Sequence, residues 1–349
     1  MSIFSLKKIE AFFFFRKTSF FSGEMSIEVE RLESLFLDSL RFLLAGPLQL
    51  RTGGAPEAMW CRRLTTVAAV HGLVGSEKVV TKRDLYYLHK TLFGTQRRAD
   101  ACVEWLSKTM EVPRSALRVV AAARGLVVGE LLWREGGQQV RVARFGRAGH
   151  LIPASLSMSV TEVDARGVKA VVYVEKEAVF HQVAASGIHE RYPVAVVTAK
   201  GFADLGTREL LAVLSRDKGL PILGIVDADP YGASILCTLL GSQKRRDPAL
   251  VSCGVEWIGV RPSMLAGMRE RKELDEAHVV KMSAADHCRC KSVLQRTDLP
   301  EDWREEMEIL QKMDRKAEIE ILDAISPNYV SDVLLTNAFA QRGIIPQSS

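Results

Sequence analysis

The chain has 349 residues, of which 47 are Lys or Arg and 42 are Asp or Glu, giving a formal net charge of +5. With 47% hydrophobic and 26% charged residues, the composition excludes a disordered, collagen-like or low-complexity chain and predicts about two globular domains. No apolar run reaches the roughly 18 residues of a membrane-spanning helix, so we expect no membrane segment. Six unevenly spaced cysteines do not form a disulfide framework and favour a reducing compartment.

The N-terminal part of the sequence divides into an extension and a helix. Residues 1–25 mix aromatic and basic residues without regular spacing, which predicts a poorly ordered extension. Apolar residues, among them Ile27, Leu35 and Leu44, then recur at helical spacing over residues 27–44. Gly and Pro residues follow, so we predict an amphipathic helix and linker over residues 26–58. The apolar stripe of this helix packs either on its own domain or on a partner.

Residues 59–152 alternate short helical patterns with strand-like segments. Helical spacing covers residues 62–73, 97–110 and 116–123. Residues 126–133 and 140–143 then alternate around Gly136 and Gly137, which predicts a β-hairpin. Three helices followed by a hairpin are the outline of a winged-helix module, a helix-turn-helix class of DNA-binding domain that protein-binding modules can also resemble.

From residue 153 to residue 349 the chain alternates buried apolar runs with amphipathic segments. The apolar runs cover residues 168–174, 194–197, 222–226 and 255–260, and residues 300–323 carry helical patterns. Continuous apolar strands that alternate with helices are typical of a parallel α/β sheet. We therefore predict an α/β (α+β overall) protein, with an N-terminal helix, a winged-helix module and a second α/β domain.

Two acidic clusters come directly after predicted strands. Glu175 follows the strand that ends at Val174, and Asp227 and Asp229 follow residues 222–226. Because ligands of α/β sheets bind at the carboxyl ends of the strands, these carboxylates are candidates for a Mg²⁺ site. A single Glu at a strand end is more commonly a solvated or capping carboxylate, so the Asp-x-Asp pair is the stronger signal.

The segment TKRDLYY, residues 81–87, carries a candidate nucleophile. A tyrosine hydroxyl can attack a phosphodiester to give a phosphotyrosine ester, and a guanidinium stabilises the charge that develops. Arg83 lies four residues before Tyr87, on the same face of a helix. By composition alone, the alternative is an aromatic pair beside a solvated charged face.

Several motifs together resemble one protein family. In chain order they are TKRDLYY, VEKEA, VTAKGFADLGTREL, VDADPYG, WIGVRPS and RKAEIE. Over about residues 60–335 they resemble the A subunit of topoisomerase VI, and most closely its eukaryotic meiotic relatives, the Spo-eleven proteins. The resemblance implies that residues 59–152 form a winged-helix DNA-cleavage domain. It also implies that residues 153–349 form a toprim metal-binding domain with C-terminal helices.

The resemblance assigns roles to individual residues. It implies that Tyr87, rather than Tyr86, is the nucleophile and that Arg83 lies near the scissile phosphate. The implied Mg²⁺ ligands are Glu175, Asp227 and Asp229. The implied DNA-binding residues are Lys82, Lys200 and Phe202.

The function that the resemblance implies is Mg²⁺-dependent transesterification that breaks duplex DNA in meiosis and initiates recombination. It further implies a homodimer whose active sites are shared between subunits, a topoisomerase VI B-like partner docked through the helix of residues 27–44, and a nuclear, chromosomal location. One alternative is a topoisomerase VI A subunit that decatenates or relaxes DNA with an ATPase B subunit. Another is a catalytically silent DNA-binding scaffold, and a toprim nuclease or primase is a weaker third.

Overall fold

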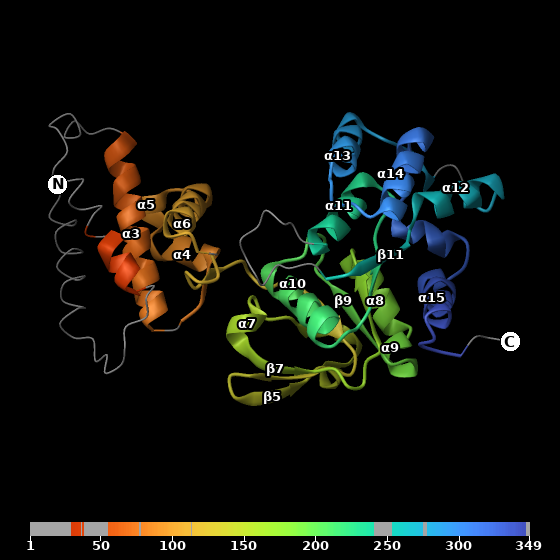
Figure 1. Ribbon diagram of the computed structural model, residues 1–349, viewed down its shortest axis with the longest axis horizontal. Helices are drawn as coiled ribbons and strands as arrows, with labels where there is room; N and C mark the ends of the chain where they lie inside the picture. Colours follow the sequence, from red (N-terminus) through yellow and green to blue (C-terminus); the bar gives the residue numbers. More distant parts are fainter. Residues whose placement is uncertain are drawn as a thin grey trace. The chain divides into compact units, whose positions relative to one another are not determined.

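The computed structural model describes residues 29–35, 37, 55–76, 78–112, 114–240, 253–274 and 278–346. The predicted extension of residues 1–25 lies outside these ranges, as does most of the predicted helix of residues 27–44, of which residues 29–35 are helical. By its internal contacts the chain divides into two compact units, Met1–Ala122 and Ala123–Ser349 (Figure 1). Within the described ranges, every helix lacks the length or the apolar character needed to cross a membrane.

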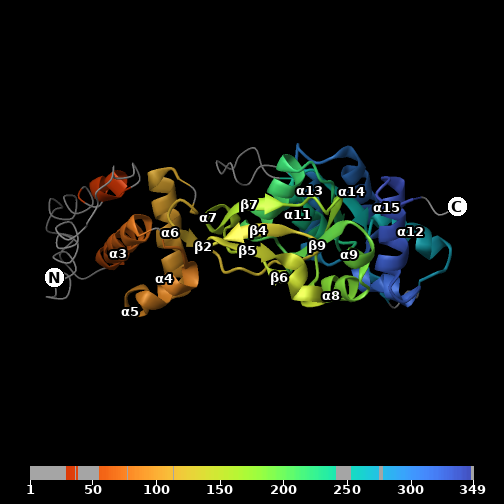
Figure 2. The ribbon, with the colours of Figure 1, turned by 90° about the horizontal axis from the view of Figure 1, so that it is seen from below.

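The first unit is mainly helical (Figure 2). Its helices are α3 (Ala55–Gly75), α4 (Lys82–Leu88), α5 (Lys90–Phe93) and α6 (Gln96–Met110). Its two short strands, β1 (Val80–Thr81) and β2 (Val119–Val120), pair in parallel. Helices α3 and α6 confirm the helical patterns that the sequence places at residues 62–73 and 97–110.

The core of the first unit holds α4 against its neighbours. Leu85 of α4 is fully buried in one apolar cluster with Val67 of α3 and Leu106 of α6. Leu32, from the described helical residues 29–35, is 1% exposed and belongs to the same cluster. The described part of the N-terminal helix therefore packs on its own unit.

The predicted helix over residues 116–123 is wrong. Residues 114–118 form turns, and Val119 and Val120 form strand β2, which pairs with Val80 and Thr81 of β1. Both valines are buried. β-Branched side chains fit a paired, buried strand better than a helix, so strand pairing overrides the apolar spacing here.

A six-stranded sheet in the order β11-β10-β8-β9-β3-β6 organises the second unit. Its strands are β3 (Leu126–Val128), β6 (His150–Leu151), β8 (Ala170–Val174), β9 (Val194–Thr198), β10 (Ile222–Ile225) and β11 (Val255–Gly259). β11, β10, β8 and β9 run parallel, whereas β3 is antiparallel to both of its neighbours. The sheet confirms the predicted α/β class.

Both faces of the sheet are buried, which explains the continuous apolar runs in the sequence. Val171 and Tyr173 of β8 belong to one core cluster, whereas Val172 and Val174 belong to the other. Successive strand residues point to opposite faces, so each apolar run supplies both cores.

Helices cover each face of the sheet (Figure 1). The first core receives residues from α7 (Leu156–Ser159), α10 (Leu205–Ala212), α11 (Pro230–Leu239), α13 (Ala284–Leu294) and α14 (Glu301–Met313). The second receives residues from α8 (Glu177–Ala185), α9 (Ile188–Arg191), α12 (Pro262–Glu270) and α15 (Thr336–Gln341). Short 3-10 or π-helical turns are η2 (Val142–Ala148), η3 (Val213–Asp217), η6 (Ile319–Ala324) and η7 (Val330–Leu335). Strands β12 (Val280–Lys281) and β13 (Arg315–Lys316) pair antiparallel.

The predicted hairpin is confirmed at its turn and corrected at its start. Strands β4 (Leu132–Glu135) and β5 (Gln138–Arg141) meet at Gly136 and Gly137, whose φ angles are +55° and +81°. Residues 126–128 belong instead to the large sheet, because Gly129, with φ +123° beside Ala195, ends β3 there. The hairpin pairs with β7 (Val160–Asp164) inside the second unit. The extent of the winged-helix module, residues 59–152, stays a prediction.

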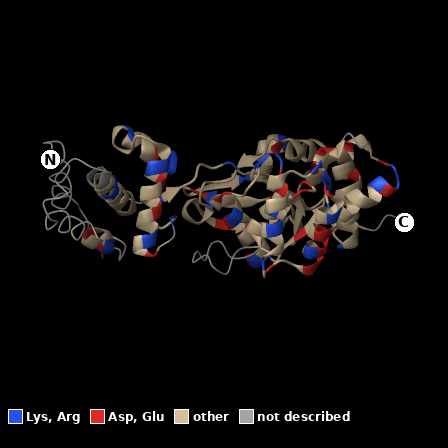
Figure 3. Cartoon of the chain, turned by 90° about the horizontal axis from the view of Figure 1, so that it is seen from above, with Lys and Arg blue, Asp and Glu red and all other residues tan. Residues whose placement is uncertain are grey.

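Figure 3 shows both Lys or Arg positions and Asp or Glu positions on many of the helices and strands of the second unit. This distribution agrees with the small formal net charge of +5.

Leu85 and Leu88 of α4 provide a matched test of the first unit's core. Leu85 is fully buried, whereas Leu88 is 67% exposed. We expect Leu85→Ala to lower the free energy of unfolding by about 2–5 kcal/mol, because it leaves a cavity in the core. Leu88→Ala should change it by less than about 0.5 kcal/mol. Urea unfolding of the two variants measures the difference, and equal effects would contradict the packing described here.

Candidate active site

The sheet brings the predicted acidic residues together at its carboxyl edge. Val174, the last residue of β8, pairs with Ile225, the last residue of β10, and Glu175 N donates to the Ile225 carbonyl oxygen at 3.0 Å. Glu175 and Asp227 therefore leave neighbouring parallel strands at one edge. Asp227 N donates to Glu175 Oε2 at 2.9 Å, which fixes the two carboxylate-bearing segments to each other.

The third carboxylate belongs to the start of α11. Asp229 is the N-cap residue of this helix, and its Oδ1 accepts a hydrogen bond from Gly232 N at 2.7 Å. Gly232 is needed at this close approach, because a Cβ there would lie 2.4 Å from the Asp227 carbonyl oxygen. The sequence VDADPYG thus supplies Asp227 and Asp229 together with the start of α11, which packs on the backbone of Asp227.

Burial and mutual repulsion make all three carboxylates hard to ionise. Burial, followed by the negative charge of Asp227, raises the pKa of Glu175 to about 8. Burial raises the pKa of Asp227 to about 6 against the lowering effect of Lys176, and it also raises the pKa of Asp229. A cation at this edge would therefore favour the ionised forms of these acids.

The segment of residues 315–320, which contains the RKAEIE motif, closes this edge from outside the main sheet. Ala317 forms an antiparallel bridge with Ala228, and Ile319 N donates to Asp227 Oδ1 at 2.9 Å. Lys316 forms an ion pair with the buried Asp286 at 2.9 Å, and its positive charge partly offsets the rise that burial causes in the pKa of Asp229. The motif thus supplies backbone and charge to two of the predicted metal ligands.

Lys176 is the residue of this edge whose role sequence reasoning missed. Its Nζ lies 3.3 Å from Asp227 Oδ2, 3.0 Å from Glu318 Oε2 and 2.7 Å from Glu320 Oε2. Burial lowers its pKa, but the hydrogen bond to Glu320 and the charge of Asp227 outweigh this effect, so the pKa is raised. The signal available in the sequence was the pair of glutamates two residues apart in RKAEIE.

The carboxylate oxygens of Glu175, Asp227 and Asp229 suit a hard divalent cation, although they do not form a complete coordination site. Among the described residues, no three His, Cys, Asp or Glu side chains are placed as a ready metal site. Carboxylate oxygens are nevertheless the ligands that Mg²⁺ prefers, and burial raises the pKa values of all three acids. Asp227 has one oxygen bonded to Ile319 N and the other paired with Lys176. A bound cation would therefore take its place beside or instead of the Lys176 ammonium.

The loop that follows β9 carries the two DNA-binding candidates of this unit. Lys200 has φ +58° and its Nζ pairs with Glu177 Oε1 at 2.8 Å, whereas Phe202 is 42% exposed. Between them, Gly201 N donates to the Glu175 carbonyl oxygen at 2.9 Å, and the Tyr173 hydroxyl donates to the Gly201 carbonyl oxygen at 2.8 Å. The loop is thus hydrogen-bonded directly to the backbone of a predicted metal ligand.

Arg124, which sequence reasoning did not single out, holds the far end of the same loop. Its backbone N donates to Asp204 Oδ2 at 2.9 Å, and its Nη2 donates to the Phe202 carbonyl oxygen at 3.1 Å. Asp204 also caps α10 through Thr207 N at 2.9 Å. These bonds fix the backbone while the Phe202 ring stays exposed.

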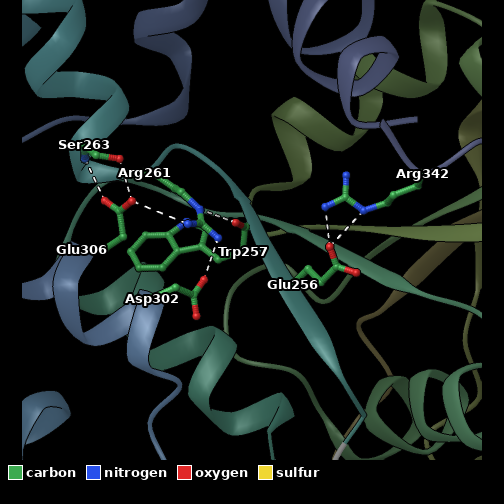
Figure 4. A network of polar contacts seen from close by, with 7 residues as sticks. All are labelled: Glu256, Trp257, Arg261, Ser263, Asp302, Glu306 and Arg342. Atoms are coloured by element: carbon green, nitrogen blue, oxygen red, sulfur yellow. Dashed lines mark hydrogen bonds and ion pairs between the residues drawn. The ribbon is translucent and has the colours of Figure 1, made fainter. Parts of the chain in front are cut away.

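The WIGVRPS motif supports the strand that presents Asp227. Val226 N donates to the Gly259 carbonyl oxygen at 2.7 Å, which joins the end of β10 to the end of β11. Arg261 and Ser263 then connect the start of α12 to Glu306 of α14 (Figure 4). Glu306 is 5% exposed and accepts from both the backbone N and the hydroxyl of Ser263. The motif is therefore part of the framework rather than of the acidic edge.

The predicted nucleophile lies on α4 in the first unit. Thr81 and Asp84 form a capping box: the Thr81 hydroxyl accepts from Asp84 N at 3.1 Å, and the Asp84 carboxylate accepts from Thr81 N at 3.0 Å. This helix start places Arg83 one turn before Tyr87. Arg83 Nη2 donates to Tyr87 Oη at 3.4 Å, and the hydrogen bond and the charge of Arg83 lower the pKa of Tyr87.

The two adjacent tyrosines have different surroundings. Tyr87 is 53% exposed, whereas Tyr86 packs against the cluster that contains Phe93. The Tyr86 hydroxyl donates to the Gly94 carbonyl oxygen at 3.4 Å. Lys82, the third candidate in this segment, begins α4 and accepts a hydrogen bond from Gln96 at its carbonyl oxygen. Of the two hydroxyls, that of Tyr87 is the one paired with a guanidinium.

Two family models match this chain. Residues 59–119 match the family model described as "Type IIB DNA topoisomerase", and residues 170–339 match the model of the Toprim domain shared by the topoisomerase 6 A subunit and Spo11. The chain is therefore of the type IIB DNA topoisomerase class. Within that class it belongs to the family of Spo11 and the topoisomerase 6 A subunits. Toprim domains are generally metal-binding domains.

The relatives that are similar to this chain include proteins named as A subunits of DNA topoisomerase 6 and proteins named as meiotic recombination proteins. The A3 subunit of DNA topoisomerase 6 from Oryza sativa is 34% identical over 77% of this chain and 61% of its own length. The A subunit of DNA topoisomerase 6 from Arabidopsis thaliana is 32% identical over 84% of this chain and 69% of its own length. Meiotic recombination protein SPO11 of Mus musculus is 31% identical over 78% of this chain and 69% of its own length. The chain thus spans between 61% and 69% of the length of these relatives.

Gly232 provides a test of the acidic edge's backbone. We expect Gly232→Ala to lower the free energy of unfolding by about 1–3 kcal/mol, because the added methyl group clashes with the Asp227 backbone. Gly254→Ala is the matched control, since a Cβ there meets no atom within 4 Å. Urea unfolding compares the two variants. A tolerated Gly232→Ala would show that α11 does not pack on Asp227 as described.

The raised pKa of Glu175 predicts a pH dependence of stability in protein kept free of divalent ions. Because the folded-state pKa of about 8 exceeds the ordinary value of 4.5, this group stabilises the fold at low pH, and that contribution is lost as the pH rises from 4.5 through 8. We expect the melting temperature of the wild type, measured in chelator, to fall as the pH rises over this range. The melting temperature of Glu175→Gln should fall less steeply with pH. Identical slopes for the two proteins would contradict the burial of an ionisable Glu175.

Proposed function

We propose that this chain cleaves duplex DNA by transesterification with Tyr87 as the nucleophile. Tyr87 Oη attacks a backbone phosphorus, a bond forms between this oxygen and the phosphorus, and the bond from the phosphorus to the 3′ oxygen breaks. The tyrosine gives up its proton, the leaving 3′ oxygen takes one, and the 5′ end remains attached to the protein. The exposed Tyr87 hydroxyl, hydrogen-bonded by Arg83 at 3.4 Å, is the observation that supports this proposal.

Arg83 would serve the reaction in two ways. Its charge lowers the pKa of Tyr87, which favours the nucleophilic phenolate. It also lies beside the attacking oxygen, where negative charge accumulates on the phosphate in the transition state. Neither role requires Arg83 to transfer a proton.

Glu175, Asp227 and Asp229 would hold the divalent cation, which we propose to be Mg²⁺. Bound there, the ion would supply Lewis-acid stabilisation of the phosphate and of the leaving oxygen. The chain's own contribution is to hold the carboxylates in place through Asp227 N, Ile319 N and Gly232 N. These backbone donors keep the carboxylates oriented before a ligand arrives.

DNA binding would use side chains beside both sets of residues. We propose that Phe202 and Lys200 contact DNA from the loop after β9 and that Lys82 contacts it from the start of α4. Exposure of Phe202 and the bonds that fix its loop support this assignment. A homodimer with the two-fold symmetry of duplex DNA would place one nucleophile on each strand, and we propose this assembly with shared active sites.

The biological role that we propose is the formation of meiotic double-strand breaks that initiate recombination, on chromosomes in the nucleus. Relatives named meiotic recombination protein SPO11 support this role. A topoisomerase VI B-like partner would dock on the helix of residues 27–44. Leu32 of that helix packs into the first unit, so the partner would use the remaining surface of the helix.

A second role shares the same chemistry. The 34% and 32% identities to proteins named as A subunits of topoisomerase 6 favour a protein that reseals DNA after cleavage, with an ATP-hydrolysing B subunit. ATP-dependent relaxation of supercoiled DNA by this chain with such a B subunit would support the second role. Cleavage that leaves broken, protein-linked DNA without relaxation supports the meiotic role.

Tyr87 and Tyr86 provide the direct test of the nucleophile. We expect wild type and Tyr86→Phe, immunoprecipitated from cells in meiosis, to accept labelled nucleotide from terminal transferase, because a cut 3′ end remains with the linked complex. Tyr87→Phe should accept none, since the attacking oxygen is removed. Tyr86→Phe is the matched control for aromatic packing. If Tyr87→Phe still carries label, the nucleophile is another residue. If no protein carries label while breaks still form in the cells, the chain is a silent scaffold.

Arg83 provides a second test of the proposed cleavage reaction, in which we expect a partial loss of rate. We expect Arg83→Ala to lower the cleavage rate by about a hundredfold, because a charged donor to the reacting oxygen is lost. Arg97 of α6, an exposed arginine of the same unit, provides the control variant Arg97→Ala. Cleavage of a labelled duplex, measured at saturating DNA, separates this effect from binding. A loss in Arg83→Ala that appears only below saturating DNA and disappears at saturation would indicate that Arg83 acts only through DNA affinity.

A further inference from the structure

Lys176 places one positive charge among three carboxylates that come from two parts of the fold. It follows Glu175 at the end of β8, and its side chain is 25% exposed. Asp227 is buried at 8% exposure, whereas the Glu318 and Glu320 side chains are 76% and 44% exposed. The ammonium therefore lies between a buried carboxylate on one side and two more solvated carboxylates on the other.

The contact with Asp227 is the longest of the three. Lys176 Nζ lies 3.3 Å from Asp227 Oδ2 but 3.0 Å and 2.7 Å from Glu318 and Glu320. If Asp227 Oδ2 were taken by another cation, the ammonium would keep both glutamate partners. The lysine can thus leave Asp227 without being left as an unpaired charge.

Both carboxylate oxygens of Asp227 already have a partner while Lys176 is in place. Its Oδ1 accepts from Ile319 N at 2.9 Å, and its Oδ2 faces Lys176. A divalent ion that binds Asp227 through Oδ2 must share this oxygen with the ammonium or displace it, and the two positive charges repel each other.

We propose that Lys176 is a built-in counter-ion that competes with the divalent cation for Asp227, and that Glu318 and Glu320 favour metal binding by retaining the displaced ammonium. This inference rests on the proposed metal site and adds a determinant of its affinity. Lys176 acts here as a positioning residue. Through Glu318 and Glu320, the RKAEIE segment would adjust the affinity of the site for the divalent cation.

The proposal predicts changes of opposite sign in metal affinity. In the full chain without DNA, Mn²⁺ binding measured by electron paramagnetic resonance, and Mg²⁺ binding measured by calorimetry, should tighten about threefold to tenfold in Lys176→Met. The double variant Glu318→Gln, Glu320→Gln should weaken binding by a similar factor, because the ammonium then turns to Asp227. In the Lys176→Met background, the same two substitutions should have a clearly smaller effect.

Controls separate this role from charge in general and from folding. Lys312→Met removes an exposed positive charge of the same unit and should leave metal affinity unchanged. If Lys176→Met proves less stable without metal, added Mn²⁺ should raise its melting temperature more than that of the wild type.

Three outcomes would overturn the proposal. Weaker binding in Lys176→Met would mean that the lysine supports the ion rather than competing with it. An equal effect of the glutamine substitutions with and without Lys176 would mean that the glutamates act by long-range charge alone. If the wild type binds neither ion, the metal site fails together with this inference, whereas wild-type binding with the wrong sign in Lys176→Met leaves the metal site standing.

Discussion

Glu175, Asp227 and Asp229 bring like charges to one buried edge of a parallel sheet, and much of the surrounding chain offsets their repulsion. The strand register sets Glu175 beside Asp227, and backbone donors from Asp227, Ile319 and Gly232 each bind one carboxylate oxygen. Lys176 adds a positive charge and is itself held by the glutamates of the RKAEIE segment. Burial raises the pKa of each acid, so a cation bound at this edge would stabilise their ionised forms.

The helix that carries the predicted nucleophile, α4, is positioned by its N-terminal cap and by one buried side chain. A capping box fixes the start of α4, and Leu85 anchors one side of the helix in the core of the first unit. The opposite side then presents Arg83 and Tyr87 to solvent with the guanidinium beside the hydroxyl. Tyr86, one residue earlier, points into a small apolar cluster instead. Exposure of one tyrosine and packing of its neighbour thus follow from helical geometry once Leu85 is buried.

The sequence was most informative where structure follows from local pattern. Four apolar runs predicted the parallel strands, since a sheet buried on both faces requires continuous apolar residues, and carboxylates directly after two of them predicted the acidic edge. Prediction failed where distant pairing decided the outcome. Val119 and Val120 form a strand because they pair with β1. β3 ends at Gly129 and pairs with β9 in the large sheet rather than extending into the hairpin. The contacts of Lys176 and Arg124 join segments 142 and 80 residues away, which no local spacing reveals.

The most direct test of the proposed chemistry is to identify the residue that becomes linked to DNA. The covalent complex would be isolated after cleavage, digested with nuclease and protease, and its nucleotide-bearing peptide sequenced by mass spectrometry. We expect a single adduct, on the hydroxyl of Tyr87, joined through a 5′ phosphate. An adduct on Tyr86 or on any other residue, or a linkage through a 3′ phosphate, would contradict the proposed chemistry.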